Sequence, residues 1–120
     1  MTSPTDSADF LLRADACLEG VAAWLEPFDP DQVDFSLADG VLTLEFGDGA
    51  RFVLNRQTAA GQMWLAAGAR AWHFDWDPSE GVWREPREDR ELAATLAEVV
   101  GARLGRSVDP PRPWGLADGG

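Results

Sequence analysis

Apolar and polar residues alternate in six short runs that follow one another through the middle of the chain. A period of two is typical of a strand with one buried face, because successive side chains point to opposite faces of a sheet. Turn sequences separate the runs, for example Ala-Asp-Gly at 38–40 and Gly-Asp-Gly at 47–49, which predicts hairpins and antiparallel pairing. The predicted strands are 33–37, 42–46, 51–55, 62–65, 72–76 and 82–84.

A helix is predicted on each side of these strands. The first begins near the Ser-Pro-Thr-Asp sequence at 3–6 and ends before Pro27, and the second covers 86–104 and ends at Gly105. Each has apolar residues at helical spacing on one face. We therefore expect an α+β fold: a two-layer sandwich in which about six antiparallel strands carry the N- and C-terminal helices on one face. The other face of the sheet would meet solvent.

The chain has 120 residues, which indicates a single domain, and we place this domain at 1–106. Residues 107–120 contain three prolines and end in Gly-Gly, so a disordered tail is expected there. The single cysteine, Cys17, excludes an internal disulfide and any multi-cysteine metal site, and we expect it in the core. We find neither a signal peptide nor a membrane-spanning segment, and we expect a cytoplasmic monomer that does not bind membranes.

Negative charge is concentrated in the first part of the sequence. The formal net charge is −11, and residues 1–48 hold eleven acidic residues against one arginine. Such a surface repels nucleic acid, which we exclude as a partner, and attracts cations or basic protein surfaces.

Six of these acidic residues form what we call the acidic ridge. Three lie along one edge of the first predicted helix and three follow its end: Asp15, Glu19, Glu26, Asp29, Asp31 and Asp34. Clusters of oxygen ligands alone suit hard cations and iron better than zinc or copper. The ridge therefore predicts a weakly held, exchangeable metal ion. The alternative is a solvated acidic surface that keeps the protein soluble.

The solvent face of the predicted sheet carries an indole among amides. We call this set the amide–indole face: Asn55, Gln57, Gln62, Trp64 and His73. An exposed aromatic residue ringed by polar groups is the composition of a protein-binding hot spot. Two alternatives are an indole packed across the sheet on neighbouring side chains, and a histidine that is only a hydrogen-bonding surface residue.

Catalytic arrangements are absent from the sequence. The glycines at 47–49 lack the strand–helix context of a phosphate-binding loop, and one histidine with one core cysteine cannot form a nucleophilic pair. The carboxylates lie on a surface ridge and not in a cleft that could separate their pKa values. We therefore expect a protein that is not an enzyme.

The central motif of the chain is Asn-Arg-Gln-Thr at 55–58, a three-residue gap, and Gln-Met-Trp-Leu-Ala at 62–66. It is flanked by Gly-Val-Leu-Thr-Leu at 40–44 and His-Phe-Asp at 73–75, and followed by Trp83. With these motifs, residues 8–105 resemble the frataxin family, and in particular its bacterial, CyaY-type members. Family ridges often carry adjacent acids where this chain has Ala22 and Ala23, so its ridge is thinner.

The resemblance implies a frataxin fold, iron on the acidic ridge, and a role in iron–sulfur cluster assembly. It also implies contact with the cysteine desulfurase and the scaffold protein, through the amide–indole face. The leading hypothesis is an iron-binding protein that acts as an iron chaperone or donor, or as a regulator of the desulfurase–scaffold complex. Two alternatives stay open: a ferroxidase or iron-storage protein, and an acidic protein-binding adaptor that needs no metal.

Overall fold

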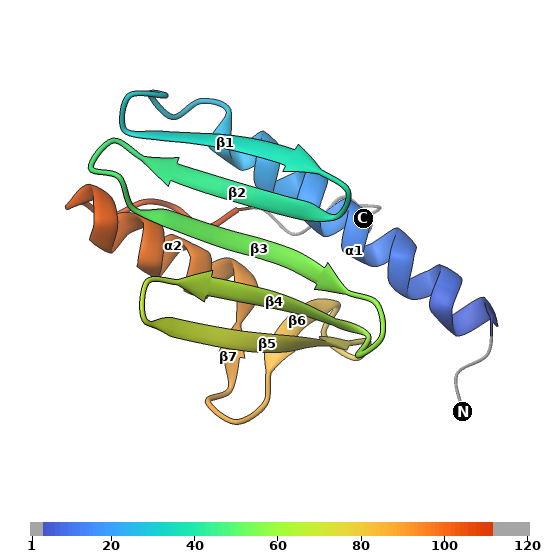
Figure 1. The fold of residues 1–120 in the computed structure, drawn as a ribbon. Coiled ribbons are helices and arrows are strands. Elements are labelled where there is room, and N and C mark those ends of the chain that lie inside the picture. Colours follow the sequence, from blue (N-terminus) through green and yellow to red (C-terminus); the bar gives the residue numbers. More distant parts are fainter. Residues whose placement is uncertain (1–3, 112–120) are drawn as a thin grey trace.

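A seven-stranded antiparallel sheet with two helices on one face makes up the fold of the computed structural model, which describes residues 4–111 (Figure 1). The strands lie in the sheet in chain order, each antiparallel to the next. The predicted α+β two-layer sandwich is confirmed. The elements are α1 (Pro4–Leu25), β1 (Val33–Ala38), β2 (Val41–Phe46), β3 (Arg51–Gln57), β4 (Gln62–Ala67), β5 (Arg70–Asp77), β6 (Val82–Glu85), β7 (Arg90–Glu91) and α2 (Leu92–Leu104).

The second helix begins later than predicted, and a seventh strand takes its place. Residues 86–89 form a turn, and β7 then pairs with β6 before α2 starts at Leu92. The buried Glu85 carboxylate explains the difference, because it accepts hydrogen bonds from the backbone amides of Arg87 (3.0 Å) and Glu88 (2.6 Å). A side chain that bonds nearby amides offers the backbone an alternative to a helix.

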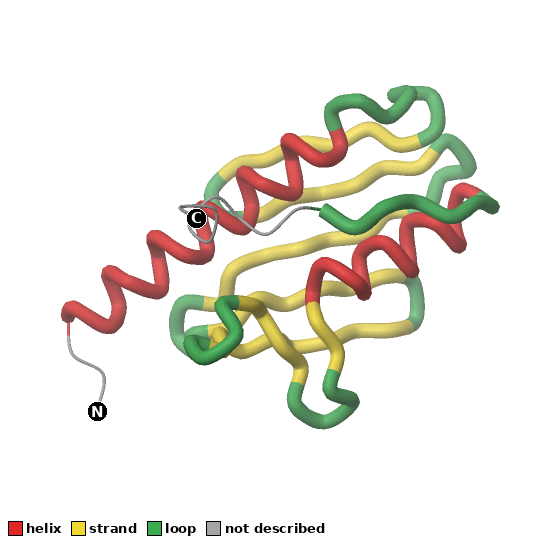
Figure 2. Tube along the Cα trace, turned by 180° about the vertical axis from the view of Figure 1, so that it is seen from behind, coloured by secondary structure: helices red, strands yellow, loops and turns green. Residues whose placement is uncertain are grey.

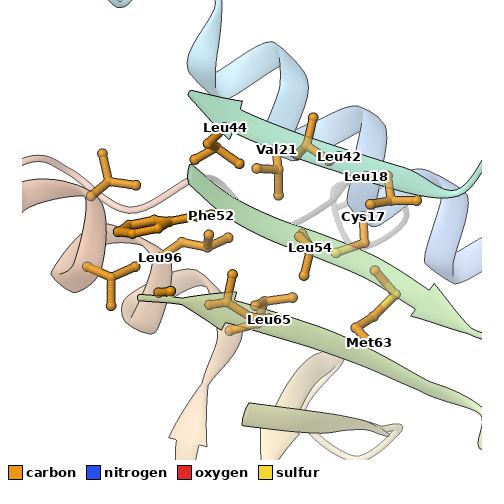
Figure 3. Packing of buried hydrophobic residues seen from close by; sticks show 14 of the residues in the cluster. Cys17, Leu18, Val21, Leu42, Leu44, Phe52, Leu54, Met63, Leu65 and Leu96 are labelled. Atoms are coloured by element: carbon orange, nitrogen blue, oxygen red, sulfur yellow. The ribbon is translucent and has the colours of Figure 1, made fainter. Parts of the chain in front are cut away.

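The core fills the space between the sheet and the helices. Figure 3 shows Leu54 and Met63 on the sheet facing Cys17 and Leu18 on α1, and all four are at most 2% exposed. Cys17 is therefore a core residue, as predicted, and burial raises the pKa of its thiol. Within residues 4–111, neither helix combines the length and apolarity that a membrane span requires.

Residues 107–111 pack against the helices instead of starting a disordered tail. They run from the end of α2 along the helical layer (Figure 2), and the Trp24 indole on α1 donates to the Asp109 carbonyl at 2.9 Å. Pro111 is buried. For these five residues the structure corrects the expected domain boundary at 106. Residues 112–120 lie outside the described residues.

Gly101 in α2 provides a test of this contact. Alanine normally stabilises a helix by about 1 kcal/mol relative to glycine. A Cβ at Gly101, however, would lie 2.7 Å from the Arg106 carbonyl oxygen and 3.6 Å from Val108 Cγ2. We expect Gly101→Ala to destabilise the protein by about 1–3 kcal/mol, the range for an overpacked site, measured by thermal unfolding.

The exposed position next to it supplies the control. Ala102→Gly measures the helix-propensity difference without the close approach. If Gly101→Ala instead stabilised the protein by the amount that Ala102→Gly costs, the segment after α2 would not contact Gly101.

Candidate functional site

The strand registers bring the five residues of the amide–indole face together. Asn55 lies opposite Trp64, and Trp64 lies opposite His73 on the next strand. In the adjacent row, Gln57 lies opposite Gln62. All five occupy alternate positions to the buried Leu54, Met63 and Phe74, so they lie on the sheet face away from the helices.

Trp64 is half-buried on this face, which corrects the expectation of an exposed indole. Its ring stacks on His73 with centroids 4.0 Å apart and an interplanar angle of 11°. The indole Nε1 donates to Gln62 Oε1 at 2.8 Å, and Gln62 Nε2 donates to Asp75 Oδ1 at 3.0 Å. The indole is therefore held in one orientation, and a partner that binds it would immobilise little further side-chain freedom.

Small apolar side chains adjoin the indole, and the sequence analysis did not identify them. Val41, 39% exposed, lies opposite Asn55, and Val53 and Ala66 lie opposite each other in the next row. Their period-two spacing relative to Thr43 and Trp64 is the sequence pattern that could have placed these side chains on the same face. An apolar centre with amides around it matches the anatomy of a protein–protein interface.

The acidic ridge is exposed along its whole length, but its carboxylates do not converge. Asp29 Oδ1 accepts the Asp31 amide at 2.9 Å, and Asp34 Oδ1 accepts the Phe35 amide at 2.9 Å. Among the side chains of residues 8–111, no three His, Cys, Asp or Glu lie close enough together to hold a metal ion. A cation on this ridge would bind through one or two carboxylates and water, so weak exchangeable binding stays a prediction.

Asp15 differs from the other ridge residues because it has a fixed counter-ion. Arg56 extends from the end of β3 to α1, and its Nη1 donates to Asp15 Oδ1. The stem of Arg56 lies against Gly40, and its backbone amide donates to the Gly40 carbonyl at 3.0 Å. A guanidinium beside the carboxylate competes with any metal ion, so Asp15 is the weakest candidate ligand of the ridge.

The two residues best suited to nucleophilic or acid–base chemistry at neutral pH lie apart. His73 is exposed on the solvent face of the sheet, whereas Cys17 is fully buried under the helix-covered face. They are the only histidine and the only cysteine of the chain. A Cys–His pair is therefore excluded by the geometry.

Comparisons with known proteins agree on one family. Residues 3–106 match the family model described as a Frataxin-like domain. The iron-sulfur cluster assembly protein CyaY of Thioalkalivibrio sulfidiphilus is 39% identical over 100 residues, which cover 82% of this chain and 94% of that protein. The protein of the same name from Dechloromonas aromatica is 36% identical over 104 residues, covering 86% and 96%.

Two solved structures extend the agreement to the fold. Frataxin from Psychromonas ingrahamii superposes with a TM-score of 0.77 at 26% identity, covering 91% of this chain and 97% of that one. A trimeric frataxin from the yeast Saccharomyces cerevisiae, complexed with ferrous iron, superposes with a TM-score of 0.61 at 28% identity, covering 88% and 91%.

Proposed function

Because this chain belongs to the frataxin family, we propose that it is an iron-binding protein of iron–sulfur cluster assembly that docks on the assembly proteins through its amide–indole face. The relatives named above as iron-sulfur cluster assembly proteins match it over most of their length, which supports the role. The observation that carries the docking is the fixed indole. Trp64 is held by Gln62 and His73 on the sheet face opposite to α1 and α2.

The proposed partners are the cysteine desulfurase and the scaffold protein of the same organism. An aromatic side chain with its orientation already set is well suited as a binding anchor, because association costs less side-chain entropy. The acidic ridge supplies a second contact, to a basic surface. We propose that the protein works as a cytoplasmic monomer. The trimer is described for the yeast relative and is not carried over to this chain.

Iron is proposed as cargo that binds at the acidic ridge outside Asp15. The yeast relative complexed with ferrous iron supports the association with iron. The exposed carboxylates of Glu19, Glu26 and Asp31 are hard oxygen ligands of the kind that iron accepts, and their exposure fits an ion that is handed on.

Calorimetry with the purified desulfurase and scaffold tests the proposal, with and without ferrous iron. We expect binding to at least one of the two proteins, and no catalytic oxygen consumption when ferrous iron is added. Binding to neither protein would contradict the docking role. Turnover of oxygen would indicate the ferroxidase alternative and make the protein an enzyme.

The association rate with a basic partner should fall steeply as salt is added. From ~0.01 M to ~1 M ionic strength the screening length falls from about 30 Å to about 3 Å, so the exposed ridge would lose its long-range attraction. Stopped-flow measurements over this range provide the rate. Glu19→Gln/Glu26→Gln is the matched variant and should show a shallower salt dependence. A rate that salt does not change would mean that the ridge only keeps the protein soluble.

A further inference from the structure

A cleft of about 310 Å³ opens at the edge of β5, next to the amide–indole face. One wall is formed by the strand residues Ala71, Trp72, His73 and Asp75, and the other by Glu85 at the end of β6 and residues 86–88 of the turn after it. The cleft exists because β6 pairs with β5 only over Asp75–Asp77, although β5 begins at Arg70. Within residues 4–111, the first part of β5 therefore has no neighbouring strand on this side.

Proline explains why the pairing stops. Continuing the register of β5 and β6 would place Pro86 opposite His73. Proline has no N–H group to donate, so the ladder cannot continue with a normal pair at this position.

The backbone groups at this edge point into the open space. The Arg56 amide bonds to the Gly40 carbonyl, so Arg56 and alternate residues of β3 bond to β2. In an antiparallel sheet, the N–H and C=O groups of successive residues point alternately to the strand on one side and the strand on the other. The registers of β3 with β4 and of β4 with β5 therefore fix which residues of β5 bond to β4. The N–H and C=O groups of Ala71 and His73 therefore point away from β4, and both residues are exposed.

The opposite wall is a fixed and acidic turn. Glu85 is only 6% exposed, and its two carboxylate oxygens hold the amides of Arg87 and Glu88. The Arg90 guanidinium donates to Glu88 Oε1 at 2.7 Å and lowers the pKa of that carboxyl. Among the residues that line the cleft, Asp75, Glu85 and Glu88 are acidic and Arg87 is basic.

We propose that the open edge of β5 binds an extended segment of the assembly protein that docks on the amide–indole face, and that the cleft receives an arginine or lysine side chain of this segment. The inference rests on the proposed function and specifies how the partner is held. In strand addition of this kind, main-chain hydrogen bonds give affinity and side-chain pockets give specificity. His73 joins the two surfaces, because its ring stacks on Trp64 and its backbone lies on the open edge.

Ala71→Pro is the decisive variant, and Ala71→Ser is its control. Proline removes the outward N–H without removing a bond to β4, and edge strands tolerate it, whereas serine keeps the N–H at nearly the same size. Affinity is measured with the purified desulfurase and scaffold. We expect Ala71→Pro to weaken binding roughly tenfold or more, about the loss of one or two hydrogen bonds, while Ala71→Ser binds like the unaltered chain.

A second measurement is independent of whether Ala71→Pro folds. In the unaltered protein, the amides of Ala71 and His73 should exchange slowly with solvent when the partner is bound and quickly when it is absent. The double variant Asp75→Asn/Glu88→Gln should weaken binding and flatten its salt dependence, as expected for a lost contact with a basic side chain.

The outcomes separate this inference from the proposed function. If Ala71→Pro binds like Ala71→Ser and both amides exchange quickly in the complex, the edge does not hold the partner, although Trp64 can still anchor it. If Ala71→Pro instead abolishes self-association, the occupant is a second copy of this chain and the inference is wrong. If neither assembly protein binds the unaltered chain, the proposed function fails and the inference falls with it.

Discussion

Trp64→Ala should weaken binding to the desulfurase or the scaffold by about 2 kcal/mol or more, which is roughly a 30-fold loss of affinity. The indole is the largest side chain of the amide–indole face, and Gln62 and His73 already fix its orientation. Removing it takes away the anchor, whereas Asn55→Ala and Gln57→Ala remove only surrounding polar groups and should have smaller effects. Calorimetry on these three variants measures whether the loss of affinity is largest for Trp64→Ala.

The same substitution should cost clearly less stability than a core truncation. Trp64 is half-buried on the solvent face, so its removal leaves no closed cavity, whereas truncating a buried tryptophan costs about 3–5 kcal/mol. Trp83 is the matched control, because it is 1% exposed on the helix-covered face of the sheet. Thermal unfolding should therefore separate Trp83→Ala, strongly destabilised, from Trp64→Ala, mildly destabilised.

Two results would contradict this interpretation. If Trp64→Ala unfolds the domain as Trp83→Ala does, the indole belongs to the core and cannot be an interface anchor. If Trp64→Ala changes neither affinity nor stability, the amide–indole face is an ordinary surface, and the proposed docking loses its main physical support.

Local patterns were sufficient to predict the sheet and the grouping of the amide–indole face. Period-two alternation assigns Trp64 and Met63 to opposite faces, and a shift of one residue would exchange the core and solvent faces of β4. The hairpin turns then determine the register that sets Asn55 opposite Trp64. These features depend on residues close in the sequence, so the sequence alone defines them.

The features that were missed depend on contacts between distant residues. Arg56 and Asp15 are 41 residues apart, and Trp24 and Asp109 are 85 apart, so no local pattern relates either pair. The start of α2 was misplaced because a buried Glu85 side chain, and not helix propensity, decides the conformation of the turn after it. Half-burial of Trp64 depends on a stacking partner from the next strand.

Replacing Asp29, Asp31 and Asp34 together by Asn should lower the affinity for ferrous iron about tenfold or more. Each ionised carboxylate within reach of a cation contributes on the order of 1 kcal/mol even in water, so losing the one or two that bind the ion accounts for this change. The fold should be retained, because an Asn Oδ1 can still accept the Asp31 and Phe35 amides that Asp29 and Asp34 now hold. Relief of like-charge repulsion should leave the melting temperature equal or slightly higher.

Asp15→Asn is the control within the same ridge, and it should behave in the opposite way. Because Arg56 already occupies the Asp15 carboxylate, the Asp15→Asn substitution should leave the affinity for iron unchanged. It should lower the melting temperature, since the guanidinium of Arg56, with its side chain 29% exposed, would lose its charged partner. Anaerobic calorimetry and thermal unfolding on both variants give the comparison. Unchanged iron affinity in the triple variant would exclude these three aspartates as the main site, and an equal loss in Asp15→Asn would show that iron displaces Arg56.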